Sequence, residues 1–159
     1  MRCVSVIALS LIAATLPASA QDHPVPYAHR PPATGDTYVP ALGEIMRAIQ
    51  LGHLKLSLAG KQGNWDLANY ELYQIQNSLS NAARLYLNIP VDKIEMIEQP
   101  LAALSEAIKA KNGARFTRAF ADFTAACNGC HQVAHVGFIA IQVPAASPFA
   151  NQSFQPSGR

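Results

Sequence analysis

The sequence predicts an all-α fold in which four antiparallel helices pack as a bundle, and three observations support this prediction. Apolar residues recur at helical spacing in four consecutive stretches of the chain. Proline, glycine or asparagine lies at the ends of these stretches and leaves only short connections, as in an antiparallel bundle. Half of the 159 residues are hydrophobic and only 14% are charged. We therefore expect one helical domain with a single core over residues 40–137.

Two segments without this pattern precede the domain. Residues 1–20 combine a positive start, an apolar centre and a small-residue end, which predicts a cleaved secretory signal peptide and a periplasmic location. The apolar centre is too short to span a bilayer, and cleavage would remove Cys3. Residues 21–39 contain four prolines and predict an extended N-terminal arm. In the predicted signal peptide, Arg2 is the positive start, Val4 to Leu16 the apolar centre and Ala18-Ser19-Ala20 the small-residue end.

The first two helices have recognisable ends. We expect the first to begin at Pro40, which suits a first helical turn, and to end near Gly60 and Gly63. Asn64 can cap the second helix, and Pro90 stops it. Their predicted core positions are Leu42, Ile45, Ile49 and Leu56, then Leu72, Ile75, Leu79, Ala82 and Tyr86.

The third and fourth helices follow after a short connection. Asp92 and Glu95 form a capping pair for the third, and Pro100 should kink it without ending it. Asn112-Gly113 is the predicted C-cap, and the fourth helix is expected over residues 114–137. Their predicted core positions are Ile94, Ile97, Leu101, Leu104 and Ile108, then Phe116, Phe120, Phe123, Cys127, Cys130 and Ala134.

The fourth helix carries a Cys-x-x-Cys-His sequence over residues 127–131, the attachment signal of c-type haem. Two thiols three residues apart project from one helix face, so both can form thioethers to one porphyrin. We predict one covalently attached haem c, with Cys127 and Cys130 as anchors and His131 as the proximal iron ligand. Asn128 and Gly129 occupy the two variable positions of the motif, where their small size avoids crowding. Because the motif continues the core stripe, the porphyrin is expected inside the bundle.

Other uses of a Cys-x-x-Cys pair remain as alternatives. A thioredoxin-like redox pair requires a βαβ context, which the helical pattern lacks. A structural zinc site needs four ligands, whereas Cys127, Cys130 and His135 supply only three. A plain disulfide stays open, because the predicted compartment is oxidising.

A four-helix bundle with this motif near the end of its last helix resembles the cytochrome c prime family over roughly residues 40–138. The resemblance implies a proximal histidine on the fourth helix and a distal position on the first. That distal position is vacant in high-spin members and holds methionine in low-spin relatives. The chain departs from the family by adding residues 138–159, which we expect to be extended and to pack back across the bundle or over a haem edge. A frayed tail beyond Phe154 is the alternative.

Many relatives in this family are homodimers, which suggests a second copy of this chain as a partner. Three leucines of the first helix lie off its main stripe and could serve such a contact. They could equally cover the C-terminal segment. These leucines are Leu51, Leu54 and Leu58.

Two residues of the first helix are candidates for the distal position. Met46 and His53 are seven residues apart, about 10 Å along the axis, so they cannot both bind one iron. Antiparallel pairing of the first and fourth helices places His131 level with about Arg47 and His53 level with about Thr124. Met46 is therefore the predicted distal ligand, with core packing as its alternative role. We expect His53 to be hydrogen-bonded across the bundle instead.

These features together predict an exported monohaem cytochrome that transfers single electrons to redox partner proteins and is not an enzyme. Ligation by Met46 would close the iron to exogenous ligands. Without it, the alternative is a five-coordinate haem that binds nitric oxide or carbon monoxide. Peroxidase-type chemistry would need a distal acid or base, and His53 is misplaced for that role. The net charge of +2 and the lack of a basic run argue against a nucleic-acid partner.

Overall fold

The computed structural model describes residues 38–86, 89 and 91–157, with only the backbone described for residues 91–94. These residues form four helices and no strand, which confirms the all-α class. The helices are α1 (Leu42–Lys61), α2 (Trp65–Leu85), α3 (Val91–Lys109) and α4 (Gly113–Val133). None of the helices in the described ranges is both long and apolar enough to cross a membrane. The predicted signal peptide and the arm as far as residue 37 lie outside the described residues.

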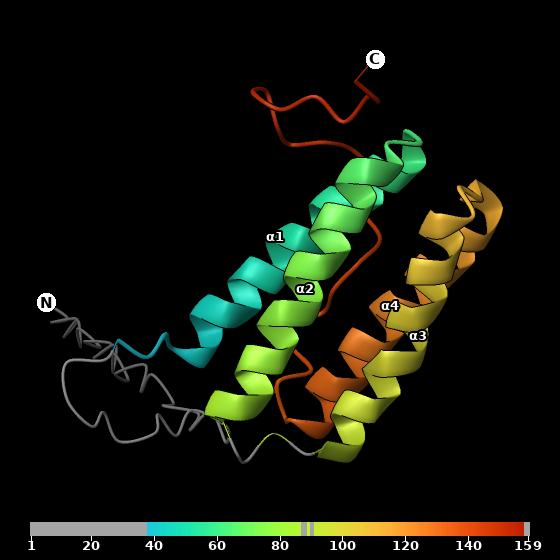
Figure 1. The fold of residues 1–159 in the computed structure, drawn as a ribbon. Helices are drawn as coiled ribbons and strands as arrows, with labels where there is room; N and C mark the ends of the chain where they lie inside the picture. Colours follow the sequence, from blue (N-terminus) through green and yellow to red (C-terminus); the bar gives the residue numbers. More distant parts are fainter. Residues whose placement is uncertain (1–37, 87–88, 90, 158–159) are drawn as a thin grey trace, which may run out of the picture.

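Consecutive helices run in opposite directions and form two hairpins (Figure 1). α1 packs mainly against α2, and α3 packs mainly against α4. Contact between α2 and α3 is sparser, and contact between α1 and α4 is sparser still. The end of α4, which carries the cysteine motif, lies at the same end of the molecule as the start of α1 (Figure 1).

The predicted core positions form one buried cluster to which all four helices contribute. Five predicted positions are only half-buried, and the side chain of Ile94 lies outside the described part of the chain. The half-buried positions are Leu42, Leu79, Cys127, Cys130 and Ala134. The aromatic rings of α4 pack in sequence, with the ring centroids of Phe116 and Phe120 5.8 Å apart. The buried predicted positions are Ile45, Ile49, Leu56, Leu72, Ile75, Ala82, Tyr86, Ile97, Leu101, Leu104, Ile108, Phe116, Phe120 and Phe123.

The starts and ends of the first hairpin differ from the prediction. α1 begins two residues after Pro40, because Ala41 is extended and its N–H donates to the Glu44 carboxylate at 2.7 Å. α2 ends before Tyr86 and so does not reach Pro90. The Tyr86 ring is buried, and its hydroxyl donates to the Pro40 carbonyl at 2.8 Å. This bond joins the end of α2 to the chain that enters α1.

The second hairpin also corrects two expectations. The left-handed residue that ends α3 is Lys111 and not Asn112 or Gly113, although the Asn112 N–H donates to the Ala107 carbonyl. The Asn112 side chain accepts a hydrogen bond from the Arg115 N–H at 3.0 Å and caps the start of α4. α4 ends four residues before Gly137. Pro100 lies inside α3, which continues through it as predicted. The capping pair predicted for Asp92 falls on a side chain outside the described residues.

Three helices end in the same hydrogen-bonded turn, in which one residue adopts the left-handed conformation. The residue is Gly63 after α1, Lys111 after α3 and His135 after α4, with φ angles of 69°, 51° and 58°. After α4, the Val136 N–H donates to the His131 carbonyl at 2.9 Å, as in a Schellman motif. The chain therefore reverses at His135, two residues before Gly137.

The C-terminal segment, residues 138–157, contains neither helix nor strand and runs back past the helices toward the turn between α1 and α2 (Figure 1). The Asn64 side-chain amide donates to the Gln155 carbonyl at 2.9 Å, and the Gln155 side chain donates to Gln62 at 2.7 Å. The Lys61 ammonium donates to the Pro144 carbonyl. Phe154 is buried in the core, so this end of the segment is anchored by both apolar and polar contacts.

The three leucines off the main stripe of α1 differ in burial. Leu51 is exposed, Leu54 is half-buried, and Leu58 belongs to the core. The C-terminal segment crosses this region, with the Lys55 ammonium 5.6 Å from the centre of the Phe149 ring. Leu58 is therefore not available to a second copy of the chain, and the homodimer stays a prediction.

Replacing Gly60 by alanine should destabilise the fold, because an added Cβ would lie 2.1 Å from the Phe116 ring. That ring is buried between Trp65 and Phe120, so it has no free space to move into. We expect Gly60→Ala to lower the free energy of unfolding by about 1–3 kcal/mol in urea titrations. Gly43→Ala is the control, because its Cβ would meet nothing within 4 Å. A Gly60→Ala protein as stable as the wild type would contradict this packing.

Candidate functional site

The cysteine motif lies on the last two turns of α4, directly after the buried part of its apolar stripe. Phe123 is fully buried one turn before the motif. Cys127 and Cys130 are half-buried and pack against the same core. The burial of the phenylalanines orients α4, so both thiols face the interior side of the helix.

His131 is held in one tautomer by the returning chain. Its Nδ1 atom lies 2.6 Å from the backbone carbonyl oxygen of Ile139. A carbonyl oxygen only accepts hydrogen bonds, so in this contact Nδ1 carries the proton and donates it. The neutral ring then keeps its lone pair on Nε2. Histidines that bind metals commonly hold their other ring N–H in such a bond, so His131 has the arrangement of an Nε2 ligand.

Asn128 occupies a variable position of the motif, so the sequence predicted no contact for it, but its side chain binds the returning chain. Its side-chain oxygen accepts from the Ile141 N–H at 2.7 Å, and its side-chain amide donates to the Ile141 carbonyl at 2.8 Å. Asn128 therefore joins α4 to the C-terminal segment. The only sequence signal for this contact was the apolar run over residues 138–143, which had to pack against something.

His53 makes a buried hydrogen bond between α1 and α4. Its Nε2 atom lies 2.9 Å from the Thr124 hydroxyl, which itself donates to the Phe120 carbonyl at 2.8 Å. His53 Nε2–H is therefore the donor in this pair. The ring lies 4.5 Å from the centre of Phe120 and 5.7 Å from that of Phe123, and burial lowers the pKa of His53 to about 4. This confirms the predicted hydrogen bond across the helices.

The bond between His53 and Thr124 also gives the axial alignment of α1 with α4. Because these helices are antiparallel, seven residues back along α1 corresponds to seven residues forward along α4. Seven residues are two turns, about 10 Å, and return to nearly the same helix face. This places Met46 level with His131, one residue from the predicted pairing with Arg47. Met46 is half-buried and packs against the core, whereas Arg47 is exposed.

The environment of the two thiols bears on the other uses of the motif. Burial, reinforced by the neighbouring Cys130, raises the pKa of the Cys127 thiol to about 12. A redox-active pair needs the opposite shift, and the C-terminal end of a helix does not provide it. Within the described residues, no three side chains of His, Cys, Asp or Glu come together as a metal site. His135 therefore does not complete a zinc site with the two cysteines.

Apolar side chains around the motif are exposed. Val133, Phe138 and Ile139 lie close to His131 along the chain, and all three are exposed. On α3, the exposed Met96 has its methyl group 3.9 Å from where a Cβ on Gly129 would lie. An apolar surface of this kind beside the two thiols and a histidine Nε2 fits a porphyrin, which is itself largely apolar.

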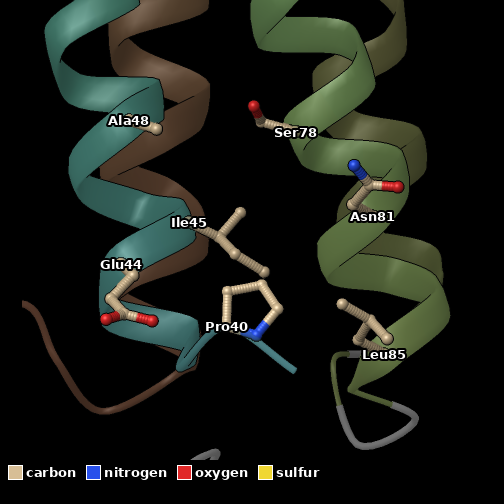
Figure 2. Close-up of a pocket in the computed structure, with 7 residues that line it drawn as sticks. All are labelled: Pro40, Glu44, Ile45, Ala48, Ser78, Asn81 and Leu85. Carbon is tan, nitrogen blue, oxygen red and sulfur yellow. The ribbon is translucent and has the colours of Figure 1, made fainter. Parts of the chain in front are cut away.

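A separate cleft of about 390 Å³ lies between the start of α1 and the end of α2 (Figure 2). Pro40 and Ile45 line one side and Ser78 and Leu85 line the other. Its lining contains none of the predicted site residues, so the cleft is distinct from the cysteine motif.

No protein-family model matches this chain, and neither a curated protein nor a solved structure matches it. The assignment of the site therefore depends on the residues and geometry of the chain itself.

Burial of His53 should make stability depend on pH. Its folded pKa of about 4 lies below the usual 6.5, so between these values the unfolded chain binds a proton that the folded chain does not. We expect the free energy of unfolding to fall by up to about 3 kcal/mol as the pH drops from about 6.5 to about 4. Urea titrations over this range would measure the loss.

His53→Gln is the control, because glutamine can donate to Thr124 and does not titrate. The difference in stability between the two proteins should change over this pH window. Glu71, whose pKa is raised by burial and partly lowered again by Lys55, titrates in both proteins and cancels. Parallel pH curves for the two proteins would show that the burial of His53 does not control this titration.

Proposed function

We propose that this chain is an exported c-type cytochrome with a four-helix bundle, similar to the cytochrome c prime family, that carries single electrons between redox partner proteins. The observation that carries the proposal is the Cys-x-x-Cys-His motif at the end of α4, in which the Ile139 carbonyl holds the Nδ1–H of His131. The predicted signal peptide over residues 1–20 supports a periplasmic location. This location also suits covalent haem attachment, because it is outside the reducing cytosol.

Each site residue has a distinct role in this proposal. Cys127 and Cys130 would hold the porphyrin through thioether bonds, and His131 Nε2 would bind the iron. Met46 would be the second iron ligand, because the alignment of α1 with α4 places it level with His131. When bound, the haem supplies the one-electron chemistry that these side chains lack. The half-buried position of the two cysteines against the core would shield part of the porphyrin, and a methionine ligand raises the reduction potential.

The second candidate is a five-coordinate haem protein that binds nitric oxide or carbon monoxide. The half-buried position of Met46 against the core fits this second candidate as well as the electron carrier. An apolar side chain can cover an open iron position without binding to it. The two candidates differ in the coordination number of the iron.

Optical spectra of the oxidised and reduced holoprotein, with and without carbon monoxide, distinguish them. We expect the wild type to be low-spin and unaffected by carbon monoxide, and Met46→Ala to be high-spin and to bind it. Met96→Ala is the matched control, because Met96 is an exposed methionine on α3, and its spectrum should equal that of the wild type. A high-spin wild type that binds carbon monoxide would favour the gas-binding protein. A wild type without haem bands would overturn both candidates.

A further inference from the structure

We propose that Asn128 is a positioning residue that clamps the C-terminal segment to α4. The clamp keeps the Ile139 carbonyl hydrogen-bonded to His131 Nδ1–H, and this hydrogen bond lowers the reduction potential of the haem. The inference rests on the proposed function, because it concerns the proximal ligand of that haem. It assigns a role to a motif position that haem attachment itself leaves variable.

Three hydrogen bonds connect one turn of α4 with residues 139–141 of the returning chain. Asn128 lies three residues before His131 and binds both backbone groups of Ile141, at 2.7 Å and 2.8 Å. Ile139, two residues earlier in the segment, accepts the bond from His131 Nδ1 at 2.6 Å. The side chain of Asn128 thus fixes the backbone that presents the acceptor to the histidine.

The bonds of Asn128 are needed because burial holds this part of the segment weakly. Phe138 is 79% exposed and Ile139 is 45% exposed. The far end of the segment is anchored separately, by the bond between Asn64 and Gln155 and by the buried ring of Phe154. The Ile139 N–H also donates to the Val136 carbonyl at 2.8 Å, within the turn after α4. Loss of the Asn128 bonds would therefore loosen the chain beyond this turn while leaving its far end attached.

The carbonyl acceptor affects the iron through the histidine. A hydrogen bond from Nδ1–H fixes the ring orientation and makes the imidazole a more basic ligand. A more basic ligand stabilises ferric over ferrous iron, so it lowers the reduction potential. When Asn128 is replaced by alanine, His131 Nδ1–H donates to mobile water in place of the Ile139 carbonyl. The ferrous form then becomes more stable relative to the ferric form.

The test is the reduction potential of the holoprotein, together with hydrogen exchange of the Ile141 amide. We expect Asn128→Ala to favour the ferrous form about tenfold, a rise of about 59 mV for one electron. The Ile141 amide should lose its protection from exchange. Asn81→Ala, an exposed asparagine on α2, is the matched control and should leave both measurements at wild-type values.

Ile141→Pro tests the same clamp from the other side, because it removes the amide that Asn128 accepts from. Ile141→Pro should also raise the reduction potential. It therefore tests the clamp even if the Asn128→Ala protein does not accumulate. The double variant should add nothing to the larger single effect. An attached haem whose potential is unchanged in Asn128→Ala or in Ile141→Pro would overturn the clamp and leave the proposed function intact. A wild type without haem would overturn the proposed function, and exchange at Ile141 would still report whether the clamp exists.

Discussion

The hydrogen bond between His53 and Thr124 is the constraint on which the rest of the site depends. Both groups are buried among phenylalanine rings, so a shift of α1 along α4 would leave a donor and an acceptor without partners in an apolar core. Such a loss costs about 1–3 kcal/mol for each group, which favours one register. That register places Met46 level with His131. The pairing of the two candidate iron ligands thus follows from a polar contact two turns away.

The early end of α4 provides the second half of the site. A helix that continued to Gly137 would carry the following residues away from the motif. Instead, His135 adopts a left-handed conformation and the chain turns back, which brings Ile139 to His131 and Ile141 to Asn128. The candidate site therefore contains residues of α4 and of the segment that follows it.

The features that the sequence predicts correctly are those that depend on local spacing. The helical stripes place most core residues, and the distance between the two cysteines places both thiols on one side of α4. The helix ends are less predictable, because Lys111 and His135 take the left-handed position that glycine usually fills. The role of Asn128 depends on a partner thirteen residues away, and a motif with two variable positions contains no sign of it.

Mass spectrometry of the exported protein would show whether one haem is covalently attached at Cys127 and Cys130. We expect a mature chain that begins at Gln21 and carries the mass of one haem. Peptide mapping should place that mass on the single peptide that contains both cysteines and His131. A mature protein whose two cysteines are unmodified thiols, or are joined in a disulfide, would contradict haem attachment.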